Sequence, residues 1–405
     1  MSVLPSTDHT IRISAEDDGN TTVALVLHEQ VVSFLTIIPL TIAVGQARVQ
    51  VAGIGGVETL EQHRKKGYSR RVLEASVLHM RRGPAALSML YGIPDFYPKF
   101  GFATAGPEYA LQVRSLSPGA PLPEGWTQRR GRPEDGTAIH RLYEQYTSHA
   151  VGAVQRPAEG AVWSRLDTTL ARTEAGEADE CRVVVRPGGG VEGYAWRGSH
   201  FWPVNNDFTD QFPQSLVIGE VIANSAPAAD AVLAACSIWG ASATTAKAEP
   251  VKDVVLSFPP QGPLYAASLR RDARLTTSSW PSENFMARTL DVYRLLKALA
   301  PELSARRRSL PSAPAATLCL ETEIGAANLV ITAEDIHFAA DGGHEHGPTS
   351  RLRLPQTELM RLSLGAMPPD DVLNRLASPP DDRTRTLIEA LFPQQHPYLH
   401  LADRI

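Results

Sequence analysis

The stretch ETLEQHRKKGYSRRVL, residues 58–73, follows a β-rich segment and leads into a helix. Its loop contains the cations of Arg64–Lys66 and then Gly67, and the helix is expected to begin near Ser69. A helix N-terminus carries free N–H groups and a partial positive charge, so it attracts anions. Glycine lets a ligand approach the backbone closely. The stretch therefore predicts a phosphate-binding turn; a basic helix start facing solvent is the alternative.

Length and composition bound the class of protein. At 405 residues the chain exceeds one ordinary hydrophobic core, so two or three domains are expected. A hydrophobic content of 43% with 20% charged residues is typical of globular proteins. The net charge of −5 argues against a general nucleic-acid or acidic-membrane binder, which needs a broad basic surface. The basic cluster in the loop is therefore local and suits a small polyanion.

Disulfide, metal and membrane signals are weak. The longest apolar stretch, residues 31–44, is too short for a bilayer and is interrupted by Pro39. His344 and His346 lie between glycines in an apparent loop, so we expect no metal there. No signal peptide is visible, and a cytoplasmic protein is expected. The three cysteines have the spacing of neither a disulfide framework nor a metal site: Cys181, Cys236 and Cys319.

The first part of the chain has mixed α/β texture. The polar first ten to twenty residues are expected to be poorly anchored. Glycines at 53, 55 and 56 predict a bulge or a close backbone approach within a strand. The elements expected are a hairpin over 21–40 with its turn at 28–30, a strand over 47–60, a helix from Ser69 to Arg82, a strand over 85–93 and a strand over 109–113.

The pattern then restarts twice. Residues 115–125, rich in Pro, Gly and Ser, predict a linker. The order hairpin, strand, helix and strand recurs after it, which predicts a diverged internal repeat. The repeat lacks cations between Ala223 and its helix at Ala228, so it is expected to be structural. A third, α+β part starts near Met286. Its expected elements are a helix over 286–303, short strands over 316–339 and helices over 357–365, 369–378 and 382–393.

These motifs resemble a known family. A strand, Arg64-x-x-Gly67-x-Ser69, a helix, a strand and Tyr97-x-x-Phe100-Gly101-Phe102 are similar to the pattern of GCN5-related N-acetyltransferases (GNAT). Ser69 stands where that family usually has Gly or Ala. The layout resembles the Eis-type (enhanced intracellular survival) branch, in which two GNAT domains, the second degenerate, precede a sterol-carrier-protein-like domain. The resemblance implies an α/β (α+β) fold with domains at 1–120, 121–284 and 285–405.

The resemblance also implies a cofactor site and partners. The cofactor would be acetyl-coenzyme A (acetyl-CoA) with no metal, the acceptor a small amine or a lysine, and the chain a homo-oligomer, since the branch forms hexamers. One departure concerns the start, because only about twenty residues precede Thr21. Either the true start lies upstream of Met1, or the domain lacks its first strand and helices. The implied cofactor contacts are Val57, Glu58, Thr59, Arg64, Lys65, Lys66, Gly67, Tyr68, Ser69, Arg70, Gly92 and Ile93.

Two residues match the family's catalytic groups. Tyr97 matches the general acid, and a phenol with an ordinary pKa near 10 is protonated at neutral pH. Packing within an aromatic cluster is the alternative, and Tyr91 is the rival, although strand alternation is expected to bury it. Ile405 matches the terminal carboxylate that serves as base in the Eis branch. With an ordinary pKa of about 3.3–3.7 it is a weak base, so it needs desolvation or acts by attracting a cationic amine.

Two hypotheses from different classes follow. The first is an N-acetyltransferase acting on a primary amine of a small polycation, such as an aminoglycoside, or on lysine. The second is a non-catalytic acyl-CoA or lipid-binding protein, which the missing N-terminal elements favour. An interaction scaffold has only the degenerate second domain to support it. Turnover on an amine separates the first hypothesis from the other two.

Overall fold

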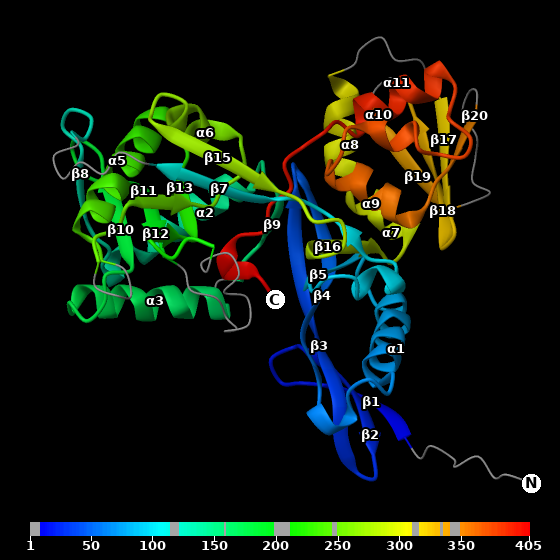
Figure 1. The fold of residues 1–405 in the computed structure, drawn as a ribbon. Coiled ribbons are helices and arrows are strands. Elements are labelled where there is room, and N and C mark those ends of the chain that lie inside the picture. Colours follow the sequence, from blue (N-terminus) through cyan, green and yellow to red (C-terminus); the bar gives the residue numbers. More distant parts are fainter. Residues whose placement is uncertain are drawn as a thin grey trace, which may run out of the picture. The chain divides into compact units, whose positions relative to one another are not determined.

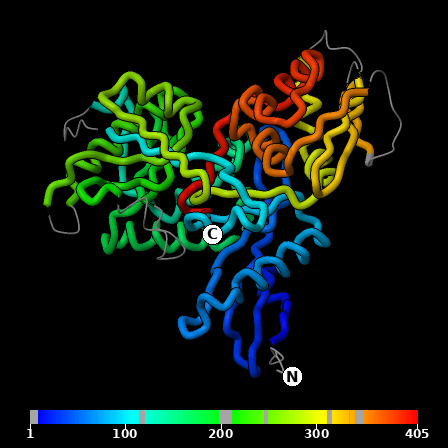
Figure 2. Tube along the Cα trace, turned by 45° about the vertical axis from the view of Figure 1, so that its right-hand side comes forward, coloured from blue at the N-terminus to red at the C-terminus, as the bar shows by residue number. Residues whose placement is uncertain are grey.

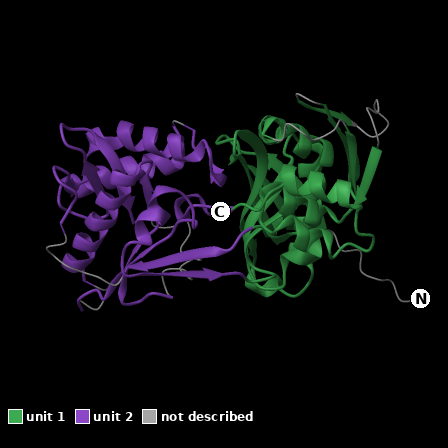
Figure 3. Cartoon of the chain, turned by 90° about the horizontal axis from the view of Figure 1, so that it is seen from above, with its two compact units in different colours: residues 1–105, 280–395, 405 green, residues 106–279, 396–404 purple. Residues whose placement is uncertain are grey.

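The computed structural model describes residues 9–113, 121–157, 159–197, 211–244, 249–309, 316–332, 335–340 and 349–405. The chain forms two compact units (Figure 3). Unit 1 comprises Met1–Ala105, Trp280–Gln395 and Ile405, and unit 2 comprises Gly106–Ser279 and His396–Arg404. Both contain helices and mixed β-sheets, which confirms the predicted α/β class. The division into three domains remains a prediction.

The main sheet of unit 1 has the strand order β1-β2-β3-β4-β5-β16-β6 (Figure 1). Only β4 and β5 are parallel neighbours within this order. The strands are β1 (His9–Ala15), β2 (Thr21–Leu27), β3 (Gln30–Val44), β4 (Ala47–Thr59), β5 (Leu87–Gly92), β16 (Asn284–Thr289) and β6 (Ala103–Thr104).

The predicted hairpin is confirmed. Leu27 pairs with Gln30, so His28 and Glu29 form a two-residue loop between β2 and β3. Both loop residues are left-handed, with φ of 48° and 64°. A tight turn with two positive φ values matches the natural twist of the flanking strands, which explains why the chain reverses here.

The start of the chain corrects one expectation. Residues 9–15 form β1, which pairs antiparallel with all of β2. A strand therefore precedes Thr21, and the expectation of a loose start and a missing first strand is wrong for these residues. The strand was hard to recognise because it is an edge strand whose apolar side chains, Ile11 and Ile13, remain 37% and 42% exposed. Residues 16–20 form a turn, so no helix separates β1 from β2.

Helix α1 (Tyr68–Arg82) covers one face of this sheet (Figure 2). It packs against β2, β3 and β4, and the buried residues of its apolar face include Val72, Leu73 and Met80. These side chains share a core with Leu35 and Ile54. The predicted helix is confirmed, with Gly67 before its first residue and Gly83 after its last.

Two strands, β7 (Glu108–Val113) and β16, belong to other units than the sequence predicted. β7 pairs with β14 (Asp253–Leu256) and β15 (Ala273–Ser278) in unit 2 rather than with the first sheet. β16 pairs with β5 and β6 in unit 1, so the helix predicted from Met286 is wrong at its start. Helix α7 (Val292–Ala298) begins only at Val292. Asp291 caps its start, because its side chain accepts a hydrogen bond from the backbone N–H of Arg294 at 2.8 Å.

The remainder of unit 1 forms a second sheet with helices. The sheet has the order β19-β18-β17-β20, and only the β17–β20 pair is parallel. Its elements are α7 (Val292–Ala298), α8 (Ala300–Arg308), β17 (Ala316–Thr322), β18 (Gly325–Ile331), β19 (Ile336–Ala340), β20 (Thr349–Arg353), α9 (Gln356–Leu364), α10 (Pro369–Leu373) and α11 (Asp382–Leu391).

Unit 2 contains two four-stranded sheets, β13-β11-β10-β8 and β12-β14-β7-β15. The apolar helix α5 (Ala226–Ser242) contributes many buried residues to its core. The other elements are β8 (Thr127–Arg130), α2 (Gly136–Thr147), β9 (Val151–Val154), α3 (Ala161–Glu174), β10 (Cys181–Val185), β11 (Val191–Trp196), β12 (Ser215–Ile218), β13 (Glu220–Ala223), β14 (Asp253–Leu256), α6 (Gly262–Ser268) and β15 (Ala273–Ser278).

The expectations about membrane helices, metal sites, cysteines and the linker can be compared with the described residues. Within the described residues, no helix is long and apolar enough to cross a membrane. No His, Cys, Asp and Glu cluster suited to a metal occurs in those same ranges, and His344 and His346 lie outside them. The three cysteines are buried. Most of the predicted linker also lies outside the described residues.

Candidate active site

The basic loop of unit 1 ends at a free helix start. Gly67 precedes α1 with φ of +78°, and no side chain caps the first turn, which also contains no acidic residue. A Cβ at Gly67 would meet no atom within 4 Å, so glycine is favoured here by the backbone angle rather than by space. Lys65 and Lys66 are exposed, and Lys65 also has a positive φ of 61°. Exposed cations beside uncapped N–H groups favour binding of an anion.

Strands β4 and β5 pair over only part of their length. The parallel register joins Val51–Ile54 to Leu87–Leu90, whereas β4 continues to Thr59 and β5 to Gly92. The register between β3 and β4 shifts between Phe34 and Thr36, and Gly56 has φ of +58°. A bulge bends a strand and redirects its edge. The predicted irregularity at the glycines is therefore confirmed, and it lies where β4 separates from β5.

The end of β4 is held by side chains on its other edge. Ser33 donates a hydrogen bond to the carbonyl of Glu58 at 2.9 Å, and its hydroxyl lies 2.8 Å from Thr59 Oγ1. Arg64 Nε donates to the carbonyl of Thr59 at 3.2 Å. Ser33 therefore fixes the end of β4 from the β3 side, and Arg64 binds it from the loop that follows. Glu58 is exposed, while Val57 and Thr59 are half-buried.

At the end of β5, Gly92 lies against the ring of Tyr97. A Cβ on Gly92 would lie 3.0 Å from Tyr97 Cδ2 and 2.7 Å from Met286 Sδ, so a larger residue would displace one of them. Ile93, the next residue, is 60% exposed. The segment that carries the tyrosine is a short 3-10 helix, Tyr97–Phe100, closed by Gly101 at φ of +76°.

Tyr97 is packed by aromatic rings. Its ring centroid lies 5.1 Å from that of Phe96 and 6.1 Å from that of Phe102, both in edge-to-face geometry. Only 6% of Tyr97 is exposed, and this burial raises its pKa to about 12. The phenol therefore keeps its proton at neutral pH. Tyr91 is half-buried, so the expectation that strand alternation buries the rival tyrosine is wrong.

The last residue of the chain, Ile405, lies against β4 in unit 1. A Cβ added to Gly53 would lie 2.2 Å from Ile405 Cδ1, and one added to Gly55 would lie 3.7 Å from the terminal carbonyl carbon of Ile405. The two glycines therefore leave the space that this residue occupies. Successive residues of a β-strand point to opposite faces, so residues 53 and 55 lie on the same face of β4.

The structure thus brings the sequence-predicted residues onto connected elements of unit 1. Val57–Thr59 end β4, the loop and the start of α1 hold residues 64–70, and Gly92 and Ile93 lie at the end of β5. Two contributors were not predicted: Ser33, which binds the end of β4, and Met286, which packs at Gly92. Ser33 had no local signal, because one serine inside an apolar strand looks like any partly exposed position.

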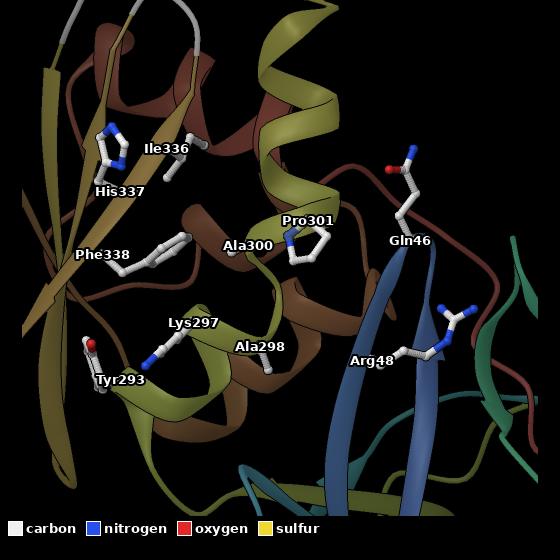
Figure 4. A pocket seen from close by; sticks show the side chains of 10 residues that line it. All are labelled: Gln46, Arg48, Tyr293, Lys297, Ala298, Ala300, Pro301, Ile336, His337 and Phe338. Atoms are coloured by element: carbon white, nitrogen blue, oxygen red, sulfur yellow. The ribbon is translucent and has the colours of Figure 1, made fainter.

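Unit 1 also contains a cavity of about 530 Å³ with different walls. Figure 4 shows Gln46 and Arg48 on the β3–β4 hairpin and Lys297 directed toward Tyr293. None of the predicted site residues lines it. The chemistry-bearing groups gather instead where β4 and β5 separate, so we assign the candidate active site to the strands.

Comparisons with known proteins agree with this geometry. Residues 8–105 match the family model described as the acetyltransferase (GNAT) domain. A search of curated proteins found no match.

Solved structures share the fold over nearly the whole chain. A GCN5-related N-acetyltransferase from Kribbella flavida is 19% identical with a TM-score of 0.65, covering 96% of this chain and 88% of that chain. One from Anabaena variabilis is 17% identical with a TM-score of 0.68, covering 95% and 89%. Eis1 from Mycobacterium abscessus is 15% identical with a TM-score of 0.60, covering 93% and 89%. At these identities the likeness shows the fold.

Proposed function

We propose that the chain transfers an acetyl group from acetyl-CoA to a primary amine, either on a small polycation such as an aminoglycoside or on a lysine. The observation that carries the proposal is the separation of β4 from β5 after Ile54, between the uncapped start of α1 and Tyr97. An extended chain with amide groups fits between two strands whose backbones no longer pair with each other beyond Ile54 and Leu90.

The proposed cofactor contacts follow from this geometry. The pyrophosphate of acetyl-CoA would be bound by the N–H groups and cations of residues 64–70, with the pantetheine arm along Val57–Thr59. Gly92 and Ile93 would flank the same arm from β5. Nothing in this set suggests a metal, since the groups are cations, backbone amides and apolar side chains that suit an organic phosphate.

The proposed chemistry is direct attack. The amine nitrogen forms a bond to the thioester carbon while the carbon–sulfur bond breaks, and holding both partners together supplies much of the acceleration. Backbone N–H groups near Val57–Thr59 stabilise the carbonyl oxygen as it becomes negative. Tyr97 gives its proton to the departing thiolate. The carboxylate of Ile405 attracts the cationic amine and accepts the proton that it loses.

The wider arrangement is part of the same proposal. We infer an Eis-like chain in which unit 2 contains a degenerate GNAT repeat and residues 285–405 include a sterol-carrier-like domain. The recurrence of hairpin, strand, helix and strand in unit 2 supports the first statement, and the separate β17–β20 sheet with its own helices supports the second. A cytoplasmic homo-oligomer remains the expected form.

The test is turnover in Tyr97→Phe. Thiol release from acetyl-CoA, with an aminoglycoside or a lysine peptide as acceptor, should show kcat lowered by about 10²–10⁴-fold, because a positioned general acid contributes that much. The dissociation constant for CoA, measured by calorimetry, should not change. Tyr91→Phe is the matched control and should retain activity. CoA binding without turnover on any amine in the wild-type protein would instead favour the acyl-CoA-binding alternative.

A further inference from the structure

The C-terminal tail, defined as residues 396–404, belongs to unit 2 and is buried there. From Tyr398 to Arg404 no residue is more than 6% exposed. Chain ends are usually exposed and poorly ordered. Burial of seven consecutive terminal residues, among them His400, Asp403 and Arg404, therefore needs specific partners for their polar groups.

In unit 2 a parallel strand pair also separates, at the boundary between the two sheets, and this boundary is called the divided sheet below. β12 pairs in parallel with β14 up to Ile218 and Leu256, and the chain then passes through Gly219 into β13, which pairs with β11 in the other sheet. The pairing of these two parallel strands therefore ends partway, as that of β4 and β5 does. In unit 1 this separation is the proposed place of acetyl-CoA.

The tail lies at this separation in unit 2. Tyr398 donates from its hydroxyl to Ser257, which directly follows β14, with 2.8 Å to Oγ and 3.1 Å to the carbonyl oxygen. His400 Nδ1 lies 3.9 Å from a carboxylate oxygen of Glu220, the first residue of β13. The tail thus contacts both strands that border the division.

β9 of unit 2 receives the same tail along its backbone. Tyr398 donates its N–H to the carbonyl of Val151 at 2.9 Å, and the red end of the chain lies beside β9 in Figure 1. Gly152 has φ of +88°, and a Cβ there would lie 2.9 Å from the carbonyl oxygen of Tyr398. Glycine is required at this position both by the backbone angle and by the close approach of the tail.

A buried charge network locks the tail. Arg156 binds Asp403 through two hydrogen bonds, 2.9 Å from Nε to Oδ1 and 3.0 Å from Nη2 to Oδ2, and also binds Glu220. The side chains of Arg156, Glu220 and Asp403 are 1%, 0% and 2% exposed. Breaking a buried pair of this kind is strongly destabilising, because it leaves an uncompensated charge. Tyr143 completes the network by donating to Asp403 at 3.1 Å.

We propose that unit 2 is a receptor for the tail of its own chain, with Arg156 as the positioning residue for the carboxylate of Ile405. Ile405 directly follows the tail and belongs to unit 1. The part concerning catalysis rests on the proposed function. The place at which a second acetyl-CoA would bind is filled by residues 398–403, so the chain binds one acetyl-CoA.

Anchoring is tested without reference to activity. Asp403→Asn removes the charge that Arg156 binds, and carboxypeptidase digestion followed by mass spectrometry reports release of the tail. We expect at least about a tenfold faster loss of the last residues than in the wild-type protein, since the variant breaks a buried pair. The control is Asp135→Asn, which breaks another bidentate pair of unit 2, with Arg129 at 2.6 and 2.7 Å, and should not change trimming.

A milder variant keeps the test valid if Asp403→Asn does not fold. Tyr398→Phe removes only the hydroxyl that binds Ser257 and should raise trimming several-fold. Equal trimming of wild-type protein and both tail variants would overturn the anchoring. A calorimetric titration with CoA should give one site per chain, and two sites would overturn the assignment of the divided sheet to the tail.

Positioning is tested by kinetics on the same proteins. Asp403→Asn should lower kcat at least tenfold, whereas its dissociation constant for CoA and the kcat of Asp135→Asn should stay unchanged. An equal kcat loss in both Asn variants would show a merely structural role and overturn the positioning. A wild-type protein that protects its tail yet turns over no amine would refute the proposed function while supporting the anchoring.

Discussion

Replacement of Gly53 by alanine tests whether the position of Ile405 matters. The added Cβ would lie 2.2 Å from Ile405 Cδ1, 3.1 Å from Leu40 Cδ1 and 3.3 Å from the carbonyl oxygen of Ile38. Carbon atoms in contact prefer about 3.5 Å, so the first of these distances is short by about 1.3 Å. The other two are tight but nearly tolerable. The substitution therefore acts on the terminal residue more than on its own sheet.

The expected magnitude follows from that displacement. Overpacking a well-filled site costs about 1–3 kcal/mol of unfolding free energy, and rotation of the Ile405 side chain reduces the cost. A displacement of about 1 Å in a reacting group lowers the rate by about 10²-fold. We therefore expect Gly53→Ala to lower kcat by about one to two orders of magnitude, with the protein still folded.

The assay is thiol release with saturating acetyl-CoA, together with calorimetric binding of CoA and thermal unfolding. The matched control is the double variant Gly53→Ala with Ile405→Ala. Alanine at 405 keeps the terminal carboxylate but lacks the Cδ1 atom that the new methyl group meets, so the double variant should recover most of kcat. If Gly53→Ala is fully active, or if the double variant is no better than the single one, the carboxylate does not act from this position.

Three further outcomes are expected. The double variant Lys65→Ala with Lys66→Ala should raise the dissociation constant for CoA about tenfold, because charge-assisted bonds are lost and the exposure of both groups limits the effect. Arg82→Ala, at the other end of α1, is the control. Equal effects of the two changes would contradict a phosphate site. Adding one glycine after Ile405 moves the carboxylate by about 3.5 Å and should abolish most turnover without changing CoA binding; unchanged turnover would refute its role. Because burial raises the pKa of Tyr97 to about 12, its phenol stays protonated until the pH approaches that value, so kcat should show no fall from this group below about pH 11; a fall near pH 9 that disappears in Tyr97→Phe would contradict this.

Local patterns in the sequence predicted the elements around the candidate site. The β2–β3 turn, the loop before α1 and the glycine irregularity in β4 each depend on residues within a few positions of one another. Backbone angles and capping act over that range, so the sequence displays them directly. The same reasoning identified Gly53 and Gly55 as close-approach positions but not what approaches them.

Pairings between distant segments were not predictable in the same way. β16 contacts β5 after an interval of almost 200 residues, and its sequence runs without a break into α7, so periodicity assigned both to one helix. The tail shows the same limit. Asp403 and Arg404 look like the polar end of a chain until Arg156 and Glu108 are found to bind them.

The starts of helices α1 and α5 explain why we expect only unit 1 to bind acetyl-CoA. In unit 1, residues 60–67 separate β4 from α1, and the first turn of α1 is uncapped. In unit 2 only Asn224 and Ser225 separate β13 from α5, and the Ser225 hydroxyl accepts a hydrogen bond from the N–H of Ala228 at 3.4 Å.

A capping side chain and a bound phosphate compete for the same N–H groups. A short capped connection therefore removes the anion site even before cations are considered. Once phosphate binding is lost, the separation between β13 and β14 no longer needs to admit a cofactor. The buried tail can then occupy this separation. Unit 2 thereby has a role that depends on its divided sheet and needs no basic loop.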